Sequence, residues 1–269
     1  LAGTFGPLYT YGVKALEMFE PAFFVAENVG GIRSANGGRA FQVILEELKD
    51  AGYRITPHLY RFEQYGVPQA RHRVLVVGVR DDLDVEYAVP APTHGPGTGY
   101  AFVTSGEVVA APMDASVTNN ERTRQSRQVV ERLELIDPGE NAFNAKRMTD
   151  QARLNVRGAT ISQIYRRLDP AKPSYTVTGS GGGGTHVYHW DEPRALTNRE
   201  RARLQTFPDT FHFEGRRDSI RKQVGMAVPP LGAQAVFTAL FRSLLGIPYE
   251  SIAPTLTTAR DSSSPQRLF

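Results

Sequence analysis

The hydrophobic pattern of the first eighty residues alternates between helical and extended periods. Apolar residues recur at helical spacing in residues 8–19 and again in residues 39–50. Residues 23–29, 53–60 and 74–79 are short apolar and aromatic runs of the kind found in buried strands. This alternation of helices and strands predicts an α/β layer with parallel strands.

The pattern weakens after residue 90. Residues 98–190 are richer in polar side chains and show weaker periodicity. Helical spacing returns at residues 197–204, where Thr197 and Glu200 form a capping-box pattern, and again at residues 233–244. We therefore expect a division into a sheet domain (1–92), a small irregular domain (93–192), a return to the sheet domain (193–246) and a mobile tail (247–269).

Composition narrows the chemistry that the chain can perform. Hydrophobic residues make up 41% of its 269 positions, which supports a core, and the net charge of +3 fits nucleic-acid binding without requiring it. The chain has no cysteine, which excludes disulfides, cysteine-ligated zinc and a thiol nucleophile from these residues, and we expect no metal site. No apolar run approaches the roughly 18 residues of a membrane span, so we expect no membrane partner.

An acid and an amide follow directly on the first strand pattern. Glu27 and Asn28 end the apolar run of residues 23–26 and stand before Gly30 and Gly31. Ligands bind at the carboxyl ends of strands in open α/β sheets, so this pair is a candidate site. A strand-end acid that caps a nearby turn is the alternative interpretation.

A second polar cluster precedes the last strand pattern. Residues 65–73 read YGVPQARHR. Arg71 and Arg73 stand at positions i and i+2 of an extended segment, so their side chains would point to one face. Together they could hold a single anionic group. The alternative interpretation is that each arginine forms an ion pair on the protein surface.

These two clusters resemble the DNA cytosine-5 methyltransferases, whose signature includes Glu-Asn-Val and Gln-x-Arg-x-Arg. Residues 194–209 are similar to the family's block Leu-Thr-x-Arg-Glu-x-Ala-Arg-Leu-Gln-x-Phe-Pro, and residues 223–231 to its last motif. The resemblance covers most of residues 20–80 and 166–240. It implies part of a Rossmann-like, S-adenosylmethionine-dependent methyltransferase sheet plus a small irregular target-recognition domain.

The resemblance also implies roles for the matched residues. Glu27 would stabilise the charge that develops at N3 of cytosine, and Arg71 and Arg73 would be catalytic residues of the same pocket. The residues implied for S-adenosylmethionine binding are Asn28, Gly225, Met226, Ala227 and Val228, with Met226 standing where the family has asparagine. The residues implied for DNA binding are Gln69, Thr176, Gly181, Gly182, Arg166 and Arg167.

Family members attack cytosine with a cysteine, and this chain has none. The family's glycine-rich cofactor loop and Pro-Cys dipeptide are also missing from the 269 residues. We therefore expect a subunit or fragment of an enzyme that methylates cytosine in double-stranded DNA, with the cysteine supplied by an amino-terminal subunit or segment. That partner would cover a sheet edge that is otherwise exposed.

Two other functions remain open. A non-catalytic, sequence-specific DNA-binding module would also lack the cysteine, although it would have no need of Glu27 at a strand end. A tRNA cytosine-5 methyltransferase would carry the same motifs, but the long variable segment 95–165 favours a DNA reader. Restriction-modification is the commonest setting of such enzymes, so we expect a prokaryotic, cytoplasmic and nucleoid-associated protein.

Overall fold

The computed structural model describes residues 8–154, 163–179, 181 and 184–257. Contacts divide the chain into two compact units. Unit 1 consists of Leu1–Arg61, His72–Ala91 and Gln234–Phe269, and unit 2 of Phe62–Arg71 and Pro92–Ala233. This division differs from the expected one at residues 62–71 and 193–233, which belong to unit 2.

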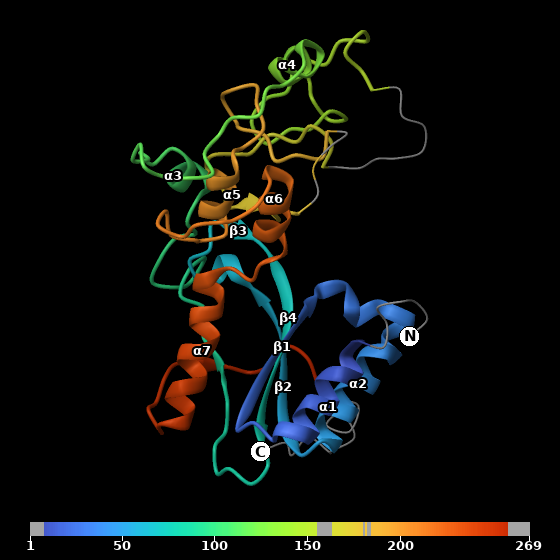
Figure 1. Cartoon of the computed structure of the whole chain (residues 1–269), viewed down its shortest axis with the longest axis vertical. Coiled ribbons are helices and arrows are strands. Elements are labelled where there is room, and N and C mark those ends of the chain that lie inside the picture. The colour runs from blue at the N-terminus through green and yellow to red at the C-terminus, as the bar shows by residue number, and fades with distance from the viewer. Residues whose placement is uncertain (1–7, 155–162, 180, 182–183, 258–269) are drawn as a thin grey trace. The chain divides into compact units, whose positions relative to one another are not determined.

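Unit 1 is built on a three-stranded sheet in the order β1-β4-β2 (Figure 1). The strands are β1 (Phe23–Val29), β2 (Tyr53–Arg61) and β4 (His72–Arg80), and β4 runs antiparallel to both neighbours. The prediction of parallel neighbours is therefore wrong. Only ten residues, 62–71, join β2 to β4, whereas a parallel crossover needs about a dozen or more.

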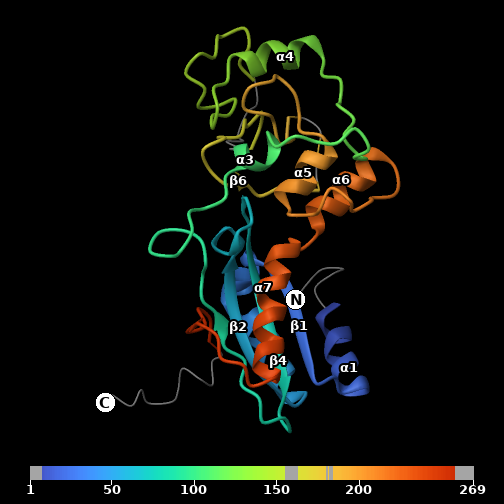
Figure 2. The ribbon, with the colours of Figure 1, turned by 90° about the vertical axis from the view of Figure 1, so that its left-hand side faces the viewer.

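Helices lie on both sides of this sheet. Helices α1 (Tyr9–Phe19) and α2 (Arg39–Asp50) lie on one side, and the part of α7 (Pro230–Leu244) that belongs to unit 1 lies on the other (Figures 1 and 2). The short helix η2 (Gly30–Gly38) leads from β1 into α2. The core under α1 and α2 consists of Leu16, Phe41, Leu45, Leu48, Tyr53, Val74 and Val76.

Part of the expected mobile tail, residues 247–269, contacts the rest of unit 1. Strand β7 (Ser251–Ile252) pairs antiparallel with β5 (Val89–Pro90). Beyond it, the backbone amide of Thr255 donates to Nδ1 of His58 at 3.1 Å. Residues 251–257 therefore contact the sheet domain, and the rest of the expected mobile tail lies outside the described residues.

Unit 2 contains short elements joined by long loops. Its helices are η3 (Phe62–Tyr65), α3 (Ser105–Val109), α4 (Arg127–Glu134), α5 (Asn198–Leu204) and α6 (Arg217–Met226), and β3 (Gln69–Ala70) pairs parallel with β6 (Ser174–Tyr175). The predicted capping box is confirmed. Thr197 Oγ1 accepts from the Glu200 amide at 3.1 Å, and the Glu200 carboxylate accepts from the Thr197 amide at 2.7 Å.

One described run is long and apolar enough to cross a membrane by length and composition alone. It is Arg217–Leu244, with a mean hydropathy of 1.5 in an 18-residue window. The run joins α6 to α7, and residues 227–229 between them are not helical. Core helices of globular proteins pass the same test, so this run is weak evidence for a membrane span. The expectation that no apolar run approaches the length of a membrane span did not anticipate this run.

Candidate functional site

Two of the predicted catalytic residues meet in unit 1. Glu27 of β1 stands opposite Leu75 of β4, which makes Arg73 its diagonal neighbour on the same face of the sheet. Glu27 Oε1 lies 2.8 Å from Arg73 Nε. The Glu27 side chain is 34% exposed and that of Arg73 is 13% exposed, so a ligand could reach the carboxylate. Burial lowers the pKa of Arg73, and the nearby Glu27 carboxylate opposes that shift.

Asn28 holds the turn that follows. Its Oδ1 accepts from the Val29 amide at 2.8 Å, a local bond that orders the end of β1. Val29 itself is exposed. Asn28 therefore has a structural role in the chain, and its contact with S-adenosylmethionine stays a prediction.

An apolar groove of about 730 Å³ opens beside Glu27 and Asn28. Its walls come from α1, α2, β1 and β4 of unit 1. Apolar side chains predominate in the lining, among them Leu16, Phe24, Phe41, Leu48 and Val74. A groove of this size and character can bury a small molecule or an apolar polypeptide segment.

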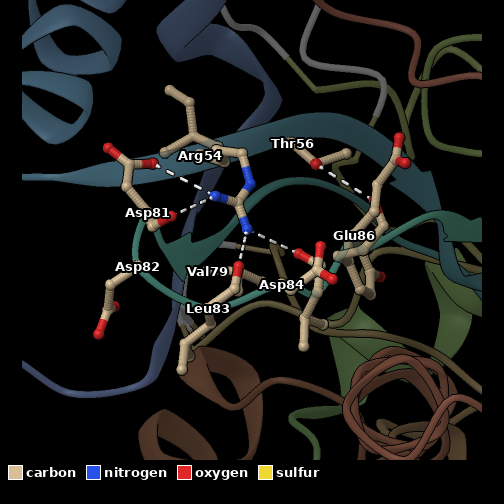
Figure 3. A pocket seen from close by; sticks show the side chains of 11 residues that line it. Arg54, Thr56, Val79, Asp81, Asp82, Leu83, Asp84 and Glu86 are labelled. Carbon is tan, nitrogen blue, oxygen red and sulfur yellow. Dashed lines mark hydrogen bonds and ion pairs between the residues drawn. The ribbon is translucent and has the colours of Figure 1, made fainter.

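A second cavity of unit 1, of about 550 Å³, is acidic (Figure 3). Its lining includes Asp81, Asp82, Asp84 and Glu86. Arg54, which also lines it, donates to the Asp81 carbonyl at 2.8 Å and to further carbonyls of the same loop. Arg54 therefore anchors the loop. Carboxylates in this number repel phosphate, so the cavity does not suit DNA. The described residues contain no cluster suited to a metal ion.

Arg71 does not share an anion with Arg73. It is buried in unit 2, where Nη1 donates to the Val177 carbonyl and Nη2 to the Gly225 carbonyl, both at 3.1 Å. A guanidinium that holds two loop carbonyls in the interior stabilises the fold. The structure therefore favours a positioning role for Arg71 over the predicted catalytic one.

Gln69 is also buried and belongs to the same interior of unit 2. Its Oε1 accepts from the Val177 amide at 2.8 Å, and its Nε2 donates to Gln205 Oε1 at 2.9 Å and to the Leu204 carbonyl at 3.2 Å. These bonds use both donors of the amide and one acceptor site of its oxygen. Gln69 therefore fixes the backbone around β3, and its burial favours this role over the predicted DNA contact.

The neighbouring arginines 166 and 167 have different environments. Arg167 is buried and donates to the carbonyls of Leu133, Ile136 and His189 at 2.8–3.0 Å. Burial lowers its pKa, and its carbonyl partners favour a structural role over the predicted DNA contact. Arg166 is half-buried, with its guanidinium carbon 4.5 Å from the centre of the Tyr175 ring, and remains a candidate for DNA binding.

The other predicted DNA contacts lie near the glycine run. Thr176 is half-buried, and its hydroxyl donates to the Ala70 carbonyl at 2.9 Å while keeping the capacity to accept. Gly181 lies against Arg221 and His186. Gly182 lies outside the described residues.

The glycine at 225 is required by the chain's own packing. A Cβ at this position would lie 2.0 Å from the Gly179 amide nitrogen. Met226 is 68% exposed and Ala227 and Val228 are half-buried, so these three residues retain surface that a cofactor could contact. The fit to S-adenosylmethionine therefore rests on residues 226–228 and not on Gly225.

Sequence reasoning missed one group of buried basic residues in unit 2. It treated residues 194–209 as structural, which suits Arg199, whose three guanidinium nitrogens donate to the carbonyls of Thr118, Pro208 and Phe211. Arg201 of the same helix is buried without such partners, beside His186 and near Arg221. The sequence signal that could have revealed this group is the position of Arg201 in the middle of a predicted core helix.

Comparisons with known proteins agree with this arrangement. The model of the family "C-5 cytosine-specific DNA methylase" matches residues 1–242. The chain is 54% identical to Type II methyltransferase M.BbvI of Brevibacillus brevis over 94% of its own length and 67% of that protein's. It is 43% identical to Type II methyltransferase M.NgoFVII of Neisseria gonorrhoeae over 86% of its own length and 62% of that protein's.

A solved structure shares the fold. It is a DNA modification methyltransferase encoded within a prophage of E. coli, with a TM-score of 0.68 at 22% identity, covering 89% of this chain and 74% of that one. The predicted methyltransferase sheet is thus confirmed. The chain spans roughly two thirds of the length of the curated relatives it matches. By its family match and its close relatives, the chain belongs to the C-5 cytosine-specific DNA methylase family.

Proposed function

We propose that this chain is the carboxyl-terminal part of a DNA cytosine-5 methyltransferase, which methylates cytosine within a specific duplex sequence. The observation that carries the proposal is the Glu27–Arg73 pair, an accessible carboxyl group held at a strand end by a guanidinium. The Type II bacterial relatives support a role in restriction-modification in a prokaryotic cytoplasm, close to the nucleoid.

The geometry suits Glu27 to the edge of a cytosine flipped out of the duplex. When a thiolate adds to C6, negative charge develops at N3, and a carboxyl group there can give or share a proton. Arg73 fixes the orientation of that carboxyl group and adds positive charge beside it. S-adenosylmethionine, when bound, supplies the methyl group, and Met226, Ala227 and Val228 are the residues we expect it to contact.

The thiolate must come from outside these residues because the chain has no cysteine. We propose that a second polypeptide or segment, carrying the family's Pro-Cys motif and cofactor loop, supplies it. Two features of unit 1 support such a partner. Among the described strands β1 pairs with β4 alone, and the apolar groove of about 730 Å³ lies beside it. An unpaired strand edge next to an apolar groove is a favourable docking site for another chain.

The experiment is methyl transfer from labelled S-adenosylmethionine to mixed-sequence duplex DNA. The chain is assayed alone and mixed with a polypeptide that carries the Pro-Cys motif and cofactor loop. We expect label in the DNA from the mixture alone, and none when every cytosine of the duplex is already 5-methylcytosine. Methyl transfer by the chain alone would refute the proposal that the thiolate comes from outside these residues.

Two further outcomes separate the alternatives. An inactive mixture that still binds duplex DNA would favour the non-catalytic DNA-binding module. Label that enters tRNA in preference to the duplex would favour the tRNA methyltransferase. A mixture containing the Glu27→Gln chain is the matched control. Its methyl transfer should be slower if the reaction depends on the proposed site.

A further inference from the structure

Three basic side chains gather around Gly181 in unit 2. Arg201 of α5 is 1% exposed, and its Nη2 lies 3.2 Å from Nδ1 of His186. Its Nη1 is buried and has no hydrogen-bond partner in the described structure. Arg221 of α6 has a side chain that is 13% exposed, and its buried Nε also has no partner there. Two guanidinium groups therefore present unused donors in one place.

The cluster carries more positive charge than its surroundings offset. Asp218 lies 2.9 Å from Arg221 Nη1, but its side chain is 81% exposed, so solvent screens it. The Glu200 carboxylate also acts on Arg201, but Glu200 is already paired with Arg194. Burial lowers the pKa of Arg201 to about 10, which leaves it charged at neutral pH. Buried positive charge without a counter-ion is costly, so an anion would stabilise this site.

His186 is neutral at physiological pH and is poised as a donor. Burial, followed by Arg201 and Arg221, lowers its pKa to about 4. Because Nδ1 faces the Arg201 guanidinium, which can only donate, the ring proton belongs on Nε2. The imidazole can therefore add a third hydrogen bond to an anion bound by the two arginines.

Gly181 brings the backbone close to the cluster. A Cβ at position 181 would lie 2.5 Å from Arg221 Nε and 2.8 Å from His186 Cε1. Any larger residue would displace these side chains, so glycine at this position preserves the space around their unused donors. Gly181 is half-buried, which places the cluster within reach of the surface of unit 2.

We propose that Arg201, Arg221 and His186 bind one phosphate of the DNA backbone. The proposal rests on the proposed function in taking DNA as the ligand. Guanidinium groups suit phosphate because they donate two hydrogen bonds in a fixed geometry. Arg199, two residues earlier in α5, shows the contrast: its guanidinium is satisfied by three carbonyls of its own chain.

The first test measures DNA binding by the chain at increasing salt and needs no methyl transfer. Fluorescence anisotropy with a labelled duplex of about 24 base pairs compares the wild-type chain, Arg221→Gln and the control Arg127→Gln. Arg127 is exposed and pairs with Glu131, so this control removes the same charge elsewhere in unit 2. Loss of one phosphate contact should make the slope of log K against log salt about 0.9 less negative.

We expect Arg221→Gln to show that change and to weaken binding about equally for duplexes of different sequence, with Arg127→Gln unchanged. Equal slopes for Arg221→Gln and the wild type would overturn the proposal, as would an equal change in both variants. Arg201→Met should act like Arg221→Gln. Because Arg201 is buried, the Arg201→Met variant can also lose stability, so its unfolding in urea is recorded as well. The result for Arg221→Gln decides the test.

The second test uses inorganic phosphate and separates a DNA phosphate from a free one. Millimolar phosphate should raise the melting temperature of the wild-type chain above that in potassium chloride of equal ionic strength, and should not do so for Arg221→Gln. A phosphate effect without a change in DNA slope would overturn the DNA assignment. If neither the phosphate effect nor the change in DNA slope is seen, the site itself is overturned. Failure of methyl transfer alone would affect the proposed function and leave both readouts intact.

Discussion

Glu27 Oε1 lies 2.8 Å from Arg73 Nε because the antiparallel register of β1 and β4 makes the two residues diagonal neighbours. The two motifs that contain them therefore form one chemical unit although they stand far apart in the sequence. The carboxyl group has a fixed partner before any base arrives. If Glu27 acts in catalysis as proposed, we expect its chemistry to depend on Arg73 for geometry as well as charge.

Glu27→Gln should slow methyl transfer and leave DNA binding nearly unchanged. The amide keeps the size of the side chain but cannot give or take the proton at N3, and general acid–base groups contribute about 10²- to 10⁴-fold. Single-turnover methylation by the reconstituted enzyme measures the first effect, and fluorescence anisotropy the second. A variant as fast as the wild type would rule out the proposed role.

Arg71→Gln and Arg73→Gln should separate stability from activity. Arg71 is buried against two carbonyls, so its loss leaves buried acceptors unpaired and should lower the free energy of unfolding by about 3 kcal/mol. Arg73→Gln should change that free energy by about 1 kcal/mol or less and should slow methyl transfer. Urea unfolding and single-turnover rates are compared for both. An Arg71→Gln protein with wild-type stability would contradict the structural role.

Local periodicity was sufficient to predict helices and strands, as α2 (Arg39–Asp50) and β1 show. Strand direction was predicted wrongly because the helix–strand alternation outweighed the short ten-residue link between β2 and β4. The roles of buried polar residues also escaped prediction. The partners of Arg71 stand 106 and 154 positions away, so nothing near it in the sequence reveals its burial.

The candidate site was predictable where the motif itself carries the chemistry. Glu27 and Arg73 were both named from sequence, and the fold brings them together. The resemblance implied DNA contacts for Gln69 and Arg167, but the interior of unit 2 uses their donors. Whether a polar residue faces DNA or the core depends on tertiary contacts that a motif does not contain.

Gly225→Ala should strongly destabilise unit 2, whereas Gly12→Ala should not destabilise unit 1. The new methyl group at position 225 would meet the backbone of Thr178 and Gly179, which should cost about 3 kcal/mol or more. A methyl group at position 12 meets nothing within 4 Å and lies inside α1, where alanine should gain about 0.5–1 kcal/mol. Urea unfolding of both variants is the measurement. If Gly225→Ala is as stable as the wild type, the backbone near Gly179 must move to make room for the methyl group.

His58 should make unit 1 less stable in mild acid. Burial lowers its pKa to about 4, against about 6.5 in the unfolded chain. Between these values the unfolded state binds the extra proton, so stability is fully present above pH 6.5 and falls as the pH drops towards 4. From pH 7 to pH 5 the loss should be about 2 kcal/mol for this residue.

His58→Asn provides the comparison, because the amide oxygen can still accept from the Thr255 amide but does not titrate. Unfolding in urea is measured for both proteins at pH 5 and pH 7. The variant should lose about 2 kcal/mol less than the wild type over this interval. Equal losses would show that His58 already binds its proton in the folded protein.

The central place of β4 determines when the sheet can form during synthesis. Among the described strands, β1 and β2 each pair with β4 and not with each other, yet β4 is made last of the three. After Val29 leaves the ribosome, roughly 40 further residues must be added before its partner begins at His72. At about 5–20 residues per second, the aromatic strand β1 waits roughly 2–8 s before β4 can pair with it. An apolar strand that stays unpaired by β4 for that interval is open to aggregation with other nascent chains.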